Sequence, residues 1–382
     1  MLYRTLGPDG PAVSILGFGC MRLPVIDGEQ NRIDYPAATA MLRDAIDAGV
    51  NYVDTAFPYH GTGFDQPGES EGFVGAALAD GYRERVLLAT KMPSWLIETR
   101  DDMERHLAEQ LERLQTDHID CYLIHALKAA WWDKLVAAGV LGFLDDAIAD
   151  GRIRYAGFSF HDELPVFKRI VDAYPWTFAQ IQYNLLDVDY QAGRQGLEYA
   201  AEHGLGVIVM EPLKGGRLAG HVPADVAAAW DTADAKRTPA QWALRWVWDQ
   251  PAVSLLLSGM TTPEQVADNI ATAATGEPDS LTCAERELVG TVRDIYRSRT
   301  RVDCTACKYC LPCPAGVDIP GVFARLNNAS LYDDYEGAKA AYLEKVAEKA
   351  SACVLCGECL PKCPQHIDIP ATLREARILF GE

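Results

Sequence analysis

Eight short apolar runs alternate with segments of helical pattern from residue 15 to about residue 275, and this alternation constrains the fold most strongly. Each run is four to eight residues long and rich in Val, Ile, Leu or Tyr, as buried parallel strands are. In order they read SILGFG, NYVDTA, RVLLATK, IDCYLIHA, IRYAGFSF, FAQIQYN, GVIVMEP and VSLLLSG. Eight strands with eight crossover helices predict an α/β fold, the (β/α)8 TIM barrel.

A doubly wound open sheet is the competing architecture for this pattern. Such a sheet carries a G-x-G-x-x-G turn after its first strand, and GFGCMR at positions 17–22 lacks the third glycine. A Pro/Gly turn separates two short apolar runs within residues 2–17, which predicts a small hairpin that closes the barrel floor. The barrel is therefore the predicted fold.

The pattern changes after about residue 280, so we expect a barrel domain over 1–280 and a second domain over 281–382. Two segments of the second domain, 282–299 and 332–350, have helical character. A near-repeat, CPAGVDIP at 313–320 and CPQHIDIP at 363–370, lies around the second of these segments. The second domain is thus predicted to be small and mostly α-helical.

The charge and cysteine content limit the partners and the compartment. A formal net charge of −19 argues against nucleic acid and against anionic membranes as partners. No apolar run approaches the ~20 residues that cross a bilayer, and the first residues lack a signal-peptide core, so we expect a cytoplasmic protein. Thiols stay reduced there, and eight of the eleven cysteines lie between 304 and 363, which indicates metal ligation rather than disulfides.

Polar residues stand at the ends of three consecutive predicted strands. Asp54 ends the second, Lys91 the third and His125 the fourth, and Tyr59 follows Asp54 by five residues. Working residues of such a barrel lie at the carboxyl ends of strands, so these side chains should meet at its mouth. Lys91 would lower the pKa of the Tyr59 phenol, and Asp54 would hold Lys91 charged. Tyr59 could then protonate a carbonyl oxygen that His125 orients.

Residues 1–275 resemble the aldo-keto reductase family. The resemblance rests on DTAxxY (Asp54 to Tyr59), on ATK ending in Lys91, on LIH ending in His125, and on TPEQVADN at 262–269. It implies a (β/α)8 barrel that reduces a small-molecule carbonyl compound with NAD(P)H, with Asp54, Tyr59, Lys91 and His125 as the catalytic residues.

The resemblance also implies a cofactor site. The implied contacts are Gly19, Cys20, Met21 and Asp54 near the nicotinamide, Ser159 and Gln180 at its carboxamide, Met210 where relatives stack an aromatic ring, and Leu213, Gly216, Gly259, Thr261, Gln265, Asp268 and Asn269 at the phosphates and adenosine. Phe160 stands where many relatives have Asn. Many NADPH-using relatives have a basic residue where Gln265 stands, which favours NADH; Lys214 or Arg217 could still bind NADPH.

The two cysteine runs predict two [4Fe–4S] clusters. The second run, C-x2-C-x2-C-x3-C-P, has the spacing of a cluster half-site, and the first run is one residue shorter. In two-cluster ferredoxins the fourth Cys of each run ligates the other cluster. One predicted set is therefore Cys304, Cys307, Cys310 and Cys363, and the other is Cys353, Cys356, Cys359 and Cys313. Structural zinc is the competing ligand for C-x2-C pairs.

The tail resembles an α-helical, ferredoxin-like iron–sulfur domain, and the chain resembles the aldo-keto reductases that carry one. Three functions stay open at this point. In the first, the chain is a carbonyl reductase and its clusters support that reaction. In the second, it is an electron-transfer protein whose barrel binds nucleotide and whose clusters serve a redox protein partner. In the third, it is a catalytically silent binding barrel. The four intact strand-end residues argue against the third. Pocket loops decide the substrate, so the sequence does not identify it, and it does not reveal the oligomeric state.

Overall fold

The computed structural model describes residues 1–220 and 222–382, and its contacts group them into two units. The first unit is Met1–Gly215 with Ala240–Thr282, and the second is Gly216–Pro239 with Cys283–Glu382. The expected boundary at 280 stays a prediction, and this grouping differs from it chiefly by adding 216–239 to the second unit.

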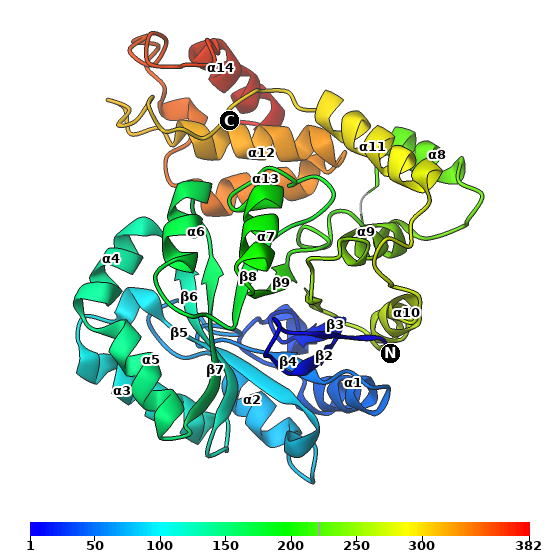
Figure 1. Ribbon diagram of the computed structural model, residues 1–382. Helices are drawn as coiled ribbons and strands as arrows, with labels where there is room; N and C mark the ends of the chain where they lie inside the picture. Colours follow the sequence, from blue (N-terminus) through cyan, green and yellow to red (C-terminus); the bar gives the residue numbers. More distant parts are fainter. Residues whose placement is uncertain (221) are drawn as a thin grey trace. The chain divides into compact units, whose positions relative to one another are not determined.

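A closed barrel of eight parallel strands forms the first unit, with its helices outside (Figure 1). The strands are β3 (Leu16–Gly19), β4 (Tyr52–Asp54), β5 (Leu87–Met92), β6 (Ile119–Leu127), β7 (Ile153–Phe160), β8 (Phe178–Gln182), β9 (Gly206–Met210) and β10 (Leu255–Ser258). Each lies within a predicted apolar run or extends it by one residue, so the barrel prediction is confirmed. The predicted hairpin is β1 (Tyr3–Thr5) with β2 (Ala12–Ser14), paired antiparallel.

Helices follow the strands of the barrel. They are α1 (Tyr35–Asp47), α2 (Ser70–Ala77), α3 (Arg100–Arg113), α4 (Ala129–Ala137), α5 (Val140–Ala149), α6 (Leu164–Val171), α7 (Gly193–Glu202), α9 (Pro239–Trp248) and α10 (Pro263–Ala273), with short 3-10 turns η1 (Ile26–Gly28), η2 (Arg83–Arg85) and η3 (Ser94–Leu96). Their starts are encoded locally. Thr99 and Asp102 form a reciprocal capping box at α3, and Asp34 caps α1. Within the described residues, no helix is both long and apolar enough to cross a membrane.

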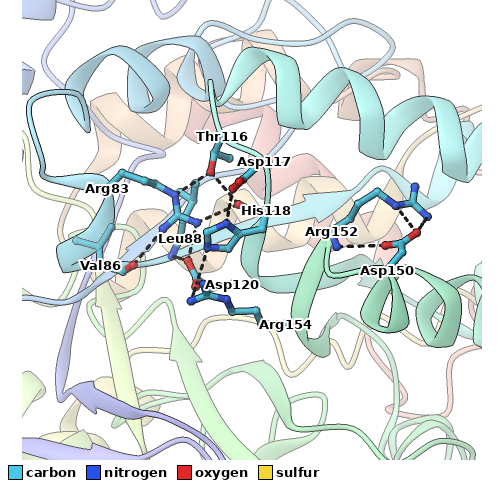
Figure 2. A network of polar contacts seen from close by, with 10 residues as sticks. All are labelled: Arg83, Val86, Leu88, Thr116, Asp117, His118, Asp120, Asp150, Arg152 and Arg154. Atoms are coloured by element: carbon cyan, nitrogen blue, oxygen red, sulfur yellow. Dashed lines mark hydrogen bonds and ion pairs between the residues drawn. The ribbon is translucent and has the colours of Figure 1, made fainter.

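A buried polar network ties the amino-terminal ends of β5 to β7 together (Figure 2). Asp120, which is 1% exposed, accepts a hydrogen bond from the Leu88 N–H at 2.9 Å. It also pairs with Arg83 at 2.8 Å and Arg154 at 2.8 Å. Because this end of the barrel is opposite the carboxyl ends of the strands, we interpret the network as structural.

The second unit is helical, as predicted. It contains α8 (Ala224–Asp231), α11 (Cys283–Ser298), α12 (Ile319–Leu331), α13 (Tyr335–Lys345), η4 (Ala350–Ala352) and α14 (Ile369–Phe380). The near-repeat has a structural meaning, because Asp318 and Asp368 cap α12 and α14 in the same way, each followed by Ile and Pro. A core that includes Val322, Phe323 and Leu373 packs α12, α13 and α14 together.

Candidate functional site

Strand register brings Asp54 and Lys91 together. Asp54 pairs with Ala89 across β4 and β5, and Lys91 lies two residues further along β5 on the same face. The Lys91 Nζ donates to Asp54 Oδ1 at 2.6 Å and to the Thr55 carbonyl at 2.8 Å. Lys91 is 1% exposed and Asp54 2%, so the ion pair is fully buried.

Tyr59 is fixed in the loop after β4, with its hydroxyl next to the ion pair. The Lys91 Nζ donates to the Tyr59 hydroxyl at 3.4 Å and lies 4.9 Å from the centre of the ring. The loop returns closely on itself at Gly68, where an added Cβ would lie 2.0 Å from the Tyr59 carbonyl oxygen. Only glycine fits there without moving Tyr59.

His125 lies where β6 becomes irregular. The pairing of β6 with β7 shifts register between Ile124 and Leu127, and Ala126 has a φ of 52°. The His125 carbonyl accepts a hydrogen bond from Ser94 at 2.7 Å, and its ring centre lies 6.3 Å from that of Tyr59. Within the described part of the chain, the buried Nδ1 of His125 has no hydrogen-bond partner. The four predicted strand-end residues therefore converge.

Burial sets the direction of the pKa shifts of Asp54, Tyr59 and His125, whereas neighbouring charges outweigh burial at Lys91. Burial raises the pKa of the Asp54 carboxyl, although Lys91 opposes it. Burial acts to lower the pKa of Lys91, but Asp54 and Tyr59 outweigh it and the net shift is upward, so Lys91 stays charged. Burial, followed by Lys91 and His161, holds the pKa of His125 well below its usual value, so its ring is neutral.

The net pKa shift of Tyr59 differs from the sequence-based expectation. Burial raises the pKa of the phenol; Lys91 lowers it, as predicted, while Asp54 raises it further. Burial outweighs the ammonium because a phenolate loses its hydration in the closed loop. Tyr59 is therefore protonated at neutral pH and has a proton to donate.

The predicted nicotinamide residues lie at the carboxyl ends of neighbouring strands. Ser159 pairs with Gln180 across β7 and β8. The Ser159 hydroxyl accepts from the Ala126 N–H at 2.7 Å, which leaves its own proton free to donate. The buried Gln180 Oε1 has no partner among the described residues. Phe160 is fully buried against Phe167, so this position offers no polar group to a carboxamide.

The other predicted contacts near the nicotinamide differ in exposure. Cys20 is buried, and its N–H donates to the Asp54 carbonyl at 2.8 Å. Met21 is 50% exposed, and Met210 and Leu213 are half-buried. Gly19 is buried, and an added Cβ there would lie 3.3 Å from the Ser258 carbonyl oxygen, so β3 and the end of β10 approach closely at this point.

The predicted phosphate and adenosine residues gather where β10 leads into α10. The Thr261 N–H donates to Gln265 at 2.8 Å, and Asn269 donates to Ser258 at 2.9 Å. Asp268 accepts from Gln241 at 2.7 Å. Leu213 and Gly216 are the exceptions, because both follow β9, and Gly216 falls in the second unit.

Sequence reasoning missed two ion pairs near these residues. The side chain of Arg22 packs over Gly259 and pairs with Glu211 at 3.0 Å. Lys214, considered for NADPH, pairs with Asp187 at 2.6 Å. Arg22 could have been found from the sequence, because it directly follows Met21, a predicted cofactor contact. The ion pairs themselves could not be predicted, because the partners Glu211 and Asp187 lie far from Arg22 and Lys214 in sequence.

The eight clustered cysteines surround two hollows in the second unit. Cys304, Cys307, Cys310 and Cys363 line one hollow. Cys353, Cys356, Cys359 and Cys313 line the other, together with Cys310. Burial raises the pKa of Cys304, and Cys307 and Cys363 add to the shift, as thiols that share one hollow should. Each hollow is lined by all four thiols of one predicted set, and Cys310 lines both hollows, so the crossed ligation stays a prediction.

Comparisons with known proteins match both units. The aldo/keto reductase family model matches residues 15–280, and a 4Fe-4S dicluster domain model matches residues 303–367. The uncharacterized oxidoreductase YrpG of Bacillus subtilis is 30% identical over 312 residues, covering 71% of this chain and 90% of that protein. A 6-dehydroglucose reductase of Novosphingobium aromaticivorans is 30% identical over 282 residues, covering 70% and 88%. The holo form of an aldo-keto reductase from Bacillus halodurans matches with a TM-score of 0.63 at 26% identity, covering 76% and 96%.

Proposed function

Because the chain belongs to the aldo/keto reductase family and carries a 4Fe-4S dicluster domain, we propose that it reduces an aldehyde or ketone to an alcohol, or catalyses the reverse, with NAD(P)H. The observation that carries the proposal is the buried Lys91 ammonium, which contacts both Asp54 (2.6 Å) and the Tyr59 hydroxyl (3.4 Å). A protonated phenol beside a fixed positive charge is suited to general acid catalysis.

The roles of the residues follow from their charges. The bound nicotinamide supplies a hydride to the carbonyl carbon. Tyr59 gives its phenolic proton to the carbonyl oxygen, and Lys91 stabilises the phenolate that remains. Asp54 keeps Lys91 charged, and neutral His125 hydrogen-bonds the same oxygen and orients the substrate.

The residues at the barrel mouth fit the nicotinamide cofactor. The unpartnered Gln180 Oε1 can accept from a carboxamide N–H, and the Ser159 hydroxyl can donate to the carboxamide oxygen. We propose NADH as the preferred form. Lys214 and Arg22 already hold carboxylate partners, and Gln265 offers no charge to a 2′-phosphate.

We further propose that each hollow holds one [4Fe–4S] cluster. Four thiols line each hollow in the crossed sets, and clusters of this kind are held by four thiolates. Zinc needs four ligands per site but does not require cysteine triplets followed by Cys-Pro, so the spacing of the two runs favours clusters over zinc. The thiols of each set therefore supply the ligands, and a bound cluster supplies one-electron transfer.

Electron transfer to a redox protein is the second candidate function. One cysteine of each set, Cys307 and Cys356, is exposed, which would bring both clusters close to the surface. Turnover of an aldehyde panel with NADH, measured with and without oxygen, separates this function from carbonyl reduction.

Tyr59→Phe tests the proposed reaction. The variant keeps the ring but loses the acidic proton, so we expect turnover to fall by about 10²–10⁴-fold. NADH affinity, measured on the same preparation by fluorescence titration, should stay within about twofold. Turnover near that of the parent protein would contradict the role of Tyr59.

A further inference from the structure

An aromatic wall extends from His125 along one side of the barrel mouth. The Trp95 ring lies 5.2 Å from the His125 ring, and the Trp131 ring lies 5.8 Å from Trp95, measured between ring centres. Phe64 meets Trp95 edge-on, and its carbonyl accepts the Trp95 indole N–H at 2.9 Å. These contacts fix the rings of the wall, which leads away from His125, the residue proposed to orient the carbonyl oxygen.

Lys128 stands at the far end of this wall. Its Nζ lies 3.8 Å from the centre of the Trp131 ring, a cation–π contact. Among residues 1–220 and 222–382, no carboxylate pairs with it. The acidic groups around α4 are engaged elsewhere: Glu98 with Lys134, Asp133 with Arg169, and Asp162 with the Ala129 N–H.

Lys128 places a positive charge at the end of this wall, in a chain that has 54 acidic and 35 basic residues. Its charge is held over the Trp131 ring, so this end of the wall repels cations. An anion that reaches Lys128 gains a counter-ion there, in a molecule whose overall charge of −19 otherwise repels it.

We propose that the substrates are carbonyl compounds with a planar, aromatic body and an anionic group at the end remote from the carbonyl. The carbonyl lies at Tyr59 and His125, the body lies along Trp95 and Trp131, and the anion pairs with Lys128. This proposal rests on the carbonyl reductase function and adds its substrate class.

The test compares 4-carboxybenzaldehyde with its uncharged methyl ester. We expect kcat/KM for the carboxylate to exceed that for the ester by about tenfold, because the ester cannot make the charged hydrogen bond. Lys128→Met should reduce this ratio toward one. Lys134→Met is the matched control, since Lys134 lies on α4, which Lys128 directly precedes, and already pairs with Glu98; the ratio should persist there.

A binding measurement separates this proposal from the reaction itself. Quenching of tryptophan fluorescence gives the affinities of 4-(hydroxymethyl)benzoate and of its methyl ester, with no turnover required. The carboxylate should bind more tightly than the ester to the parent protein, and this difference should disappear in Lys128→Met. That result supports the substrate class even if neither aldehyde is reduced and the reductase function fails. Equal ratios in the parent protein and Lys128→Met, in turnover and in binding, overturn the role of Lys128 and leave the reductase function standing.

Discussion

Removing the Lys91 ammonium should destabilise the barrel, because the Asp54 carboxylate would be left buried without its partner. Asp54 is 2% exposed, and its Oδ2 already lacks a hydrogen-bond partner among the described residues. Lys91→Met keeps most of the apolar stem, so the change is mainly one of charge. Loss of one member of a buried ion pair typically costs about 3–5 kcal/mol, and we expect the free energy of unfolding to fall by that amount.

A second variant separates stability from catalysis. Asp54→Asn combined with Lys91→Met removes both charges, and we expect it to recover most of the lost free energy of unfolding, to within about 1–2 kcal/mol of the parent protein. Turnover should not recover, because no ammonium remains beside the Tyr59 hydroxyl. Both variants should therefore turn over at least about 10²-fold more slowly than the parent protein.

Urea unfolding followed by tryptophan fluorescence measures stability, and NADH oxidation at saturating aldehyde measures turnover. Because the chain has two units, the unfolding of the barrel is compared only between variants with equal m-values. A Lys91→Met protein as stable as the parent would show that the Asp54 carboxylate is not left as an uncompensated buried charge. Recovery of turnover in the double variant would show that Lys91 does not assist Tyr59.

Four other predictions concern the cofactor, the cysteine sets and Asp120. With the aldehyde fixed, kcat/KM should be higher with NADH than with NADPH, and a tenfold or greater preference for NADPH, about 1.4 kcal/mol, would contradict the interpretation of Gln265. Anaerobic iron and sulfide analysis should give about eight irons per chain. Cys363→Ser should damage the cluster held by Cys304, Cys307 and Cys310; damage confined to the other cluster would exclude crossed ligation. Asp120→Asn should lower the free energy of unfolding by about 3–5 kcal/mol, since Asp120 neutralises two arginines from a buried position, and urea unfolding within about 1 kcal/mol of the parent protein would contradict this.

The barrel could be predicted because each strand and helix is encoded locally. A run such as IRYAGFSF is apolar at nearly every position, as a strand covered on both faces must be, and the observed β7 spans that run from Ile153 to Phe160. The positions of Asp54, Lys91 and His125 followed from the strands alone, because side chains at the carboxyl ends of neighbouring parallel strands meet.

Long-range pairings could not be predicted in this way. Residues 216–239 group with the second unit through contacts such as Arg299 with Asp225 at 2.9 Å, which are separated by 74 residues. The ion pair between Lys214 and Asp187 also joins residues that are distant in sequence. The net pKa of Tyr59 also depends on how deeply the loop buries the phenol, which the sequence does not state.

The first cysteine run is one residue shorter than the second, yet its last cysteine lies in the expected hollow. Both runs continue their third cysteine with Leu-Pro, and the second run then has one extra residue, Lys362, before its last cysteine. The missing residue therefore falls after Pro312, and Cys313 still lines the same hollow as Cys353, Cys356 and Cys359. Past this point the two halves match again, because Asp318 and Asp368 cap equivalent helices and the buried Ile319 and Ile369 both line the hollow of the Cys304 set. Capping and apolar contact thus hold the two halves in equivalent positions, and the ligand loops between them can differ by one residue without losing a thiol from either set.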